Sequence, residues 1–196
     1  MKRVLVTGAN SFTARHLLAL GHTRIGFVGG LRNVSTATER LRGYRLALRD
    51  ADAPVANELI RSGAFKAEGA RLAASDLLKP RDRPTAIVAG NDLMALGVMQ
   101  AAGDLGLRIP ADLAVVGFDD IEIAGHREIQ LTTMAQQKAE MGRLAVLGML
   151  EIIREPRRCL RQPLQRVLAP TLIVRRTCGA LAAASGSQER KGGPRG

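Results

Sequence analysis

Aromatic residues and cysteines are scarce in this chain of 196 residues. Phenylalanine, tyrosine and tryptophan together make up 3% of the sequence, and tryptophan is absent. The core must therefore be built from aliphatic side chains, which suits a sheet covered by helices on both faces. The two cysteines, Cys159 and Cys178, are too few for a disulfide framework and lack the spacing of metal ligands. We expect a cytoplasmic protein with no metal and no other cofactor.

Long apolar runs are also missing. No run approaches the roughly 18 residues that cross a bilayer, so we expect no membrane partner. Residues 1–12 (MKRVLVTGANSF) carry basic side chains but too short an apolar stretch for a signal peptide. The hydrophobic fraction of 46% and the length allow one domain with a substantial core, and not two.

Positive charge is in excess, and the formal net charge is +11. Most of this excess lies in residues 154–196, which hold ten Lys or Arg and two Asp or Glu. Neither a basic recognition helix nor interleaved aromatic residues accompany it, so we interpret it as a solvated basic segment rather than a nucleic-acid surface. Residues 179–196, rich in Ala, Ser and Gly, are predicted to form a disordered basic tail.

The clearest local pattern is a β-α-β unit. Two apolar runs of strand length, residues 86–89 and 113–118, flank a segment whose apolar residues have helical spacing. Asn91 follows the first run, Asp119 follows the second, and each precedes a further aspartate. In parallel α/β sheets ligands bind at the carboxyl ends of the strands, so this unit predicts a ligand site there.

The rest of the chain continues the alternation of strands and helices, which predicts an α/β fold with a doubly wound parallel sheet. Further strands are expected at residues 4–7, 24–28, 59–60, 131–134 and 172–176, and helices at 12–20, 38–50, 67–78 and 139–153. Right-handed crossovers would bring the loops that follow the strands to one edge of the sheet. These loops are residues 29–40, 62–65, 90–92 and 117–120.

The order of these loops resembles the effector-binding domain of LacI/GalR-type bacterial transcription regulators, which are related to periplasmic sugar-binding proteins. The resemblance covers roughly residues 14–178. Its motifs are HLLALGHTRIGFVGG (16–30), ERLRGYRLAL (39–48), the segment 84–124 with AGND and GFDD, LTTMAQ (131–136), MGRLAV (141–146) and TLIVRR (171–176). It implies a periplasmic-binding-protein-like fold of two α/β lobes joined by three crossings, with a small ligand such as a sugar in the cleft.

The chain departs from the full family plan. The resemblance implies that residues 1–178 are the effector-binding domain, mainly its C-terminal lobe. Residues 139–161 would belong to the N-terminal lobe, most of which is absent, as is the helix-turn-helix. DNA contact would then need a domain outside this chain, and the full-length family implies a homodimer. A non-functional gene fragment is an alternative interpretation.

Five residues are candidate contacts for the ligand. The resemblance implies that Arg40 clamps the ligand, that the ring of Phe65 stacks on it, and that Gln136 at the second crossing approaches it. Asp119 would accept hydrogen bonds from ligand hydroxyls, and Asn91 could both donate and accept. Arg40 could instead be an ordinary surface arginine and Phe65 a core residue. Asn91 and Asp119 could only cap a helix or a turn.

We assign different roles to the aspartates that follow Asn91 and Asp119. Asp92 is expected to cap the helix that starts near it, which leaves Asn91 free for the ligand. Asp120 is expected to cap the turn after its strand. No catalytic residue is predicted, because the three histidines are scattered and no nucleophile, base and acid fall in a usable order.

An enzyme is the rival interpretation. The stretch VLVTGANSF resembles the start of a short-chain dehydrogenase or sugar epimerase, where a glycine-rich turn binds a nucleotide. The glycine spacing fails, since Gly8 is followed by Ser11 and Ala14. The Tyr-x-x-x-Lys pair of that class is also missing, because Leu48 stands four residues after Tyr44.

Overall fold

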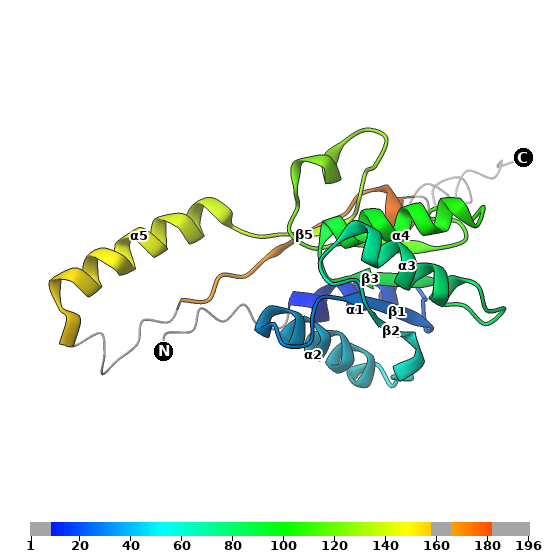
Figure 1. Cartoon of the computed structure of the whole chain (residues 1–196), viewed down its shortest axis with the longest axis horizontal. Helices are drawn as coiled ribbons and strands as arrows, with labels where there is room; N and C mark the ends of the chain where they lie inside the picture. The colour runs from blue at the N-terminus through cyan, green and yellow to red at the C-terminus, as the bar shows by residue number, and fades with distance from the viewer. Residues whose placement is uncertain (1–8, 158–165, 182–196) are drawn as a thin grey trace, which may run out of the picture.

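The computed structural model describes residues 9–157 and 166–181 (Figure 1). Four parallel strands form the central sheet in the order β2-β1-β3-β4. The strands are β1 (Ile25–Gly29), β2 (Ile60–Ser62), β3 (Ala86–Ala89) and β4 (Ala114–Val116). The predicted parallel α/β sheet is confirmed, and the strand expected at residues 4–7 lies outside the described residues.

Two pairs of helices cover the opposite faces of this sheet (Figure 1). They are α1 (Ala9–Ala19) and α2 (Ser35–Asp50) on one face, and α3 (Ala67–Leu78) and α4 (Asp92–Asp104) on the other. Successive strand residues point to opposite faces. Phe27 therefore packs with Tyr44 on the α2 side, with ring centroids 5.0 Å apart, whereas Val28 packs on the α3 and α4 side.

The helix α2 begins earlier than the expected start at Thr38. The Thr38 hydroxyl does not cap the helix, because it donates to the carbonyls of Arg32 and Val34 instead. Short 3-10 turns complete the body: η1 (Asn57–Leu59), η2 (Glu122–Gly125) and η3 (Arg176–Cys178). The last of these replaces the end of the strand expected at residues 172–176.

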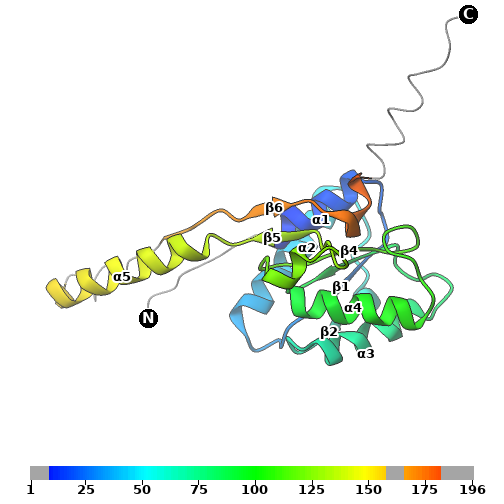
Figure 2. The same cartoon turned by 90° about the horizontal axis from the view of Figure 1, so that it is seen from above.

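Two strands leave the edge of the parallel sheet as an antiparallel pair, β5 (Thr133–Ala135) and β6 (Thr171–Ile173). Single parallel bridges, Val116 to Thr132 and Asp119 to Ala135, attach β5 to the β4 edge. The strand β5 leads to α5 (Lys138–Arg154), which projects away from the body in both views (Figures 1 and 2). The helix predicted at 139–153 is thus confirmed, and none of its residues is buried.

The structure describes the first three residues of the predicted tail, 179–181. Gly179 has a left-handed backbone, with φ of +82°, that ends η3, and Ala180 packs against the core beside α1 and α2. The assignment of residues 179–196 to a disordered tail stays a prediction. Residues 182–196 lie outside the described residues.

Candidate functional site

The loops after the parallel strands meet at the carboxyl edge of the sheet. The amide of Gly63, after β2, donates to the carbonyl of Gly29 at 2.7 Å, and the amide of Asp92 donates to the carbonyl of Phe118 at 2.8 Å. The Arg40 guanidinium crosses from α2 to the carbonyl of Gly90, after β3. The predicted convergence of these four loops is confirmed.

Asp119 is the centre of the polar cluster at this edge. Its Oδ1 accepts a hydrogen bond from Gln136 Nε2 at 2.6 Å and lies 3.4 Å from Arg40 Nη2. The guanidinium of Arg40 also stacks over the Phe118 ring, with its Cζ 3.9 Å from the ring centroid. Three of the candidate residues therefore come together from α2, from the loop after β4 and from the end of β5. Their ligand contacts stay predictions.

Burial perturbs both charges of this pair. It raises the pKa of Asp119, against the opposing effects of Arg40, Gln136 and Lys138, and it lowers the pKa of Arg40. Both changes show that desolvation outweighs the stabilisation that the neighbours provide. Among the described contacts both partners of the Asp119 side chain reach Oδ1, so Oδ2 can still accept hydrogen bonds from a ligand.

The backbone at this edge holds non-glycine residues in a rare conformation. The φ angles are +111° at Asp119, +48° at Asp120 and +61° at Phe65. L-residues with positive φ are uncommon, and such strain gathers at functional sites when the surroundings enforce it. Ala64, next to Phe65, has a φ of +53° as well. The observation adds to the polar cluster as a sign of function, because Asp119 and Phe65 are candidate ligand contacts.

Phe65 lies over the backbone that follows β1. A Cβ atom on Gly30 would stand 2.1 Å from the ring Cζ of Phe65, so only glycine permits this approach. The ring is partly buried and packs against the core beside α3 and α4. Phe65 is therefore a core residue that also lies at the candidate edge. Its stacking on a ligand stays a prediction.

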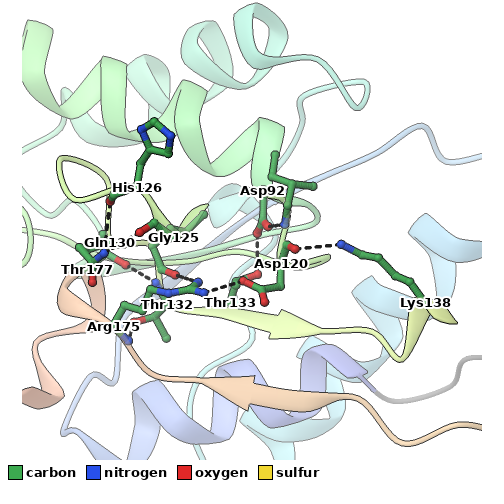
Figure 3. Close-up of polar contacts among 12 residues, drawn as sticks. Asp92, Asp120, Gly125, His126, Gln130, Thr132, Thr133, Lys138, Arg175 and Thr177 are labelled. Atoms are coloured by element: carbon green, nitrogen blue, oxygen red, sulfur yellow. Dashed lines mark hydrogen bonds and ion pairs between the residues drawn. The ribbon is translucent and has the colours of Figure 1, made fainter. Parts of the chain in front are cut away.

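The structure gives Asn91 the cap role that was expected of Asp92. Asn91 Oδ1 accepts from the amide of Met94 at 2.9 Å and is the cap of α4, so the expectation that Asp92 is the cap is wrong. Asp92 is fully buried, and its carboxylate accepts from the Thr133 hydroxyl and from the amide of Ile121 (Figure 3). The ligand contact predicted for Asn91 now rests on its amide nitrogen, since its oxygen serves the helix.

Asp120 binds an arginine that sequence reasoning missed. The expectation that Asp120 caps the following turn is wrong, because its carboxylate accepts from Arg175 Nη2 at 2.8 Å (Figure 3). Its carbonyl accepts from Lys138 Nζ, also at 2.8 Å. Arg175 lies among the basic residues near the C-terminal end, where no local pattern marks it as the partner of a residue so distant in sequence.

No three His, Cys, Asp or Glu side chains of the described residues gather in a way that could hold a metal ion. His16 approaches Cys178 Sγ at 3.4 Å, and His22 lies 3.0 Å from the Thr85 hydroxyl. No helix of the described chain is both long and apolar enough to span a membrane. Gly8 of the rival nucleotide motif lies outside the described residues.

This fold defines a class, an α/β lobe with a parallel sheet, and in such sheets small ligands bind at the carboxyl ends of the strands. Residues 14–178 match the family model of the periplasmic binding protein-like domain, and the chain belongs to that family. The resemblance to the domains of LacI-type regulators is confirmed by the relatives below, which are transcriptional regulators.

Three comparisons describe this relationship. The ribose operon repressor of Haemophilus influenzae is 39% identical over 165 residues, which are 84% of this chain and 49% of the repressor. A LacI-family regulatory protein from Chloroflexus aggregans superposes with a TM-score of 0.78 at 32% identity, over 87% of this chain and 60% of that one. The complex of the transcriptional regulator CelR with cellobiose gives a TM-score of 0.81 at 31% identity, over 87% and 51%. The chain thus spans about half the length of the curated relatives it matches.

Proposed function

We propose that this chain is the effector-sensing part of a LacI-type transcriptional regulator and that its effector is a sugar or a related small metabolite. The observation that carries the proposal is the cluster of Asp119, Arg40 and Gln136 at the carboxyl edge of the sheet. The cellobiose bound to CelR and the ribose operon repressor among the relatives support the choice of a sugar.

The chemistry of these side chains suits a polyhydroxylated ligand. Asp119 Oδ2 can accept hydrogen bonds from hydroxyls, the Arg40 guanidinium and the Gln136 amide can donate, and the Asn91 amide nitrogen adds a further donor. The ring of Phe65 offers an apolar surface to the C–H groups of a sugar. In a two-lobed protein a second lobe would close over these groups, and a lobe without that wall should bind sugars weakly.

The whole regulator would act through parts that this chain does not contain. We propose that α5 and the neighbouring residues up to 161 pack in an N-terminal lobe of a longer protein, that a helix-turn-helix there contacts DNA, and that the full-length form is a cytoplasmic homodimer. Binding of the effector would change operator affinity only if the two states of the protein bind the effector with different affinities. The chain would be a sensor and not an enzyme.

Titration of the isotope-labelled chain with ribose and with cellobiose, followed by NMR, tests the proposal. We expect one of the sugars to shift the amide signals of residues 90–92 and 118–120. The Asp119→Ala variant should bind it more weakly by about 1.5–3 kcal/mol, since it removes one partner of charged hydrogen bonds.

The matched control is Asp112→Ala, which removes an aspartate that pairs with Arg108 away from this edge. It should leave the affinity unchanged. Equal sugar affinity in the Asp119→Ala variant and the wild type would exclude Asp119 as a ligand contact.

A further inference from the structure

A cavity of about 490 Å³ lies between α2 and the outer strand β2. Its walls are the ends of β1 and β2, the turn η1, and the stripe of α2 that carries Thr38, Leu41 and Arg45. None of the five candidate contacts at the sheet edge lines it. The loops after β1 and β2 contribute to its lining, and Gly30 among them lies under the Phe65 ring, so the cavity adjoins the candidate edge on its β2 side. Its volume is in the range of small-molecule pockets.

Three arginines from three different segments line this cavity. They are Arg32 in the loop after β1, Arg45 on α2 and Arg61 on β2, and no aspartate or glutamate is among the lining residues. Three positive charges that converge without a lining carboxylate attract an anion. The lining is thus strongly basic, although α2 as a whole carries both signs of charge.

The contacts of Arg45 and Arg61 hold them in place and leave donors unused. Arg45 Nη2 donates to Asn57 Oδ1 at 3.1 Å, and Arg61 Nη1 donates to the carbonyls of Glu58 and Ile60 at 2.8 and 3.1 Å. A guanidinium has five N–H donors in a planar fork, so both arginines can still bind an anion. Such pre-oriented forks suit the paired oxygens of phosphate and carboxylate groups.

The rest of the lining is apolar. Phe27, Leu41 and Ile60 contribute carbon surface beside the arginines. A ligand that fits both parts of the cavity has a charged end for the arginines and an apolar body for this surface.

We propose that this cavity binds a small organic anion, a phosphomonoester or a carboxylate on an apolar body, beside the proposed sugar site. The proposal does not depend on the sugar, because none of the five candidate sugar contacts lines the cavity. The chain would then bind a second small molecule, beside the stripe of α2 that carries Thr38, Leu41 and Arg45.

The test is an NMR titration of the isotope-labelled full chain with phenyl phosphate, with benzoate, and with phenol as the neutral control. We expect phenyl phosphate or benzoate to give saturable shifts at residues 29–32 and 57–62, at millimolar concentration and low salt. Phenol should give none. Comparison of the two anions tells whether the site prefers phosphate or carboxylate.

Two variants and a control assign the effect to the arginines. Arg32→Gln and Arg45→Gln should each weaken binding of the preferred anion roughly tenfold, the effect of losing one charged hydrogen bond. Arg32 is exposed and forms no ion pair with a described residue, so its variant keeps the fold. The control Arg42→Gln removes an arginine of the same helix that pairs with Glu39 outside the cavity, and it should bind like the wild type.

The proposal is overturned if neither anion gives saturable shifts, if phenol binds equally well, or if Arg42→Gln weakens binding as much as Arg32→Gln. The Asp119→Ala variant keeps the two proposals apart, since it should lose sugar binding and keep anion binding. A chain that binds the anion and no sugar would therefore contradict only the proposed function.

Discussion

The guanidinium of Arg175 donates to the carboxylate of Asp120 at 2.8 Å and so joins the segment after β6 to the loop after β4 (Figure 3). The same guanidinium donates to the carbonyl of Leu131, before β5, at 2.8 Å. Because Asp120 follows Asp119 directly, this pair fixes the segment after β6 against the loop that carries Asp119.

The Arg175→Ala variant should lower the free energy of unfolding by about 1.5–3 kcal/mol, because it leaves the half-buried carboxylate of Asp120 without its charged hydrogen-bond partner. A double-mutant cycle with Asp120→Ala, measured by denaturant unfolding, isolates the coupling between the two side chains. The pair of Arg108 and Asp112, in which the arginine side chain is 77% exposed, is the control and should show weaker coupling. Equal coupling in the two pairs would contradict the role assigned to Arg175.

Burial raises the pKa of Asp92 to about 6, although the hydrogen bonds from Thr133 and Ile121 oppose the shift. Between about pH 4 and pH 6 the folded state then keeps a proton that the unfolded chain has released. The free energy of unfolding should therefore fall by about 1–3 kcal/mol as the pH rises through this window, and Asp92 adds no further change above it.

The Asp92→Asn variant has no such proton and should lose this part of the pH dependence. Denaturant unfolding of both proteins at several pH values measures the difference. Asp82→Asn, which alters a carboxylate that is 76% exposed, is the control for the loss of a charge. Parallel pH profiles of the Asp92→Asn variant and the wild type would show that Asp92 does not titrate in this window.

Asn91 can be tested as a helix cap and as a ligand contact with two substitutions. Asn91→Ala removes the acceptor for the amide of Met94 and should cost about 0.5–2 kcal/mol of stability. Asn91→Ser keeps a cap and removes the amide nitrogen, so it should unfold like the wild type and bind the sugar more weakly. Thermal unfolding and the sugar titration separate the two roles. Unchanged sugar affinity in the serine variant would leave Asn91 as a cap alone.

The projecting helix α5 should make the isolated chain self-associate. Val146, Met149 and Ile153 are 61%, 59% and 69% exposed and lie at helical spacing along one stripe. An apolar stripe of this size favours association in water. Sedimentation velocity should show oligomers that dissociate in a Val146→Gln, Ile153→Gln double variant. Leu72→Gln on α3, at a leucine that is 56% exposed, is the control. A monomeric wild-type chain would show that the stripe does not drive association.

Local patterns of the sequence determined the elements and the edge where the candidate residues meet. The helix at 67–78 and the strand at 86–89 have the predicted bounds, because apolar spacing and the flanking residues are local signals. The meeting of the loops follows from the handedness of β-α-β units, which needs no side-chain detail. Asp119 could therefore be placed at the edge before any contact was known.

Only the tertiary structure decided which partner each polar side chain takes. Asn91 and Asp92 are both able to cap a helix, and the burial of Asp92 against Thr133 assigned the cap to Asn91. Arg175 lies beside Asp120 because β6 pairs with β5. The periodicity of the sequence does not predict this pairing. The cavity beside α2 likewise combines residues from three separate segments. Hydrophobic periodicity records which face a residue turns to the core, whereas hydrogen bonds and cavities depend on which distant segments are brought together.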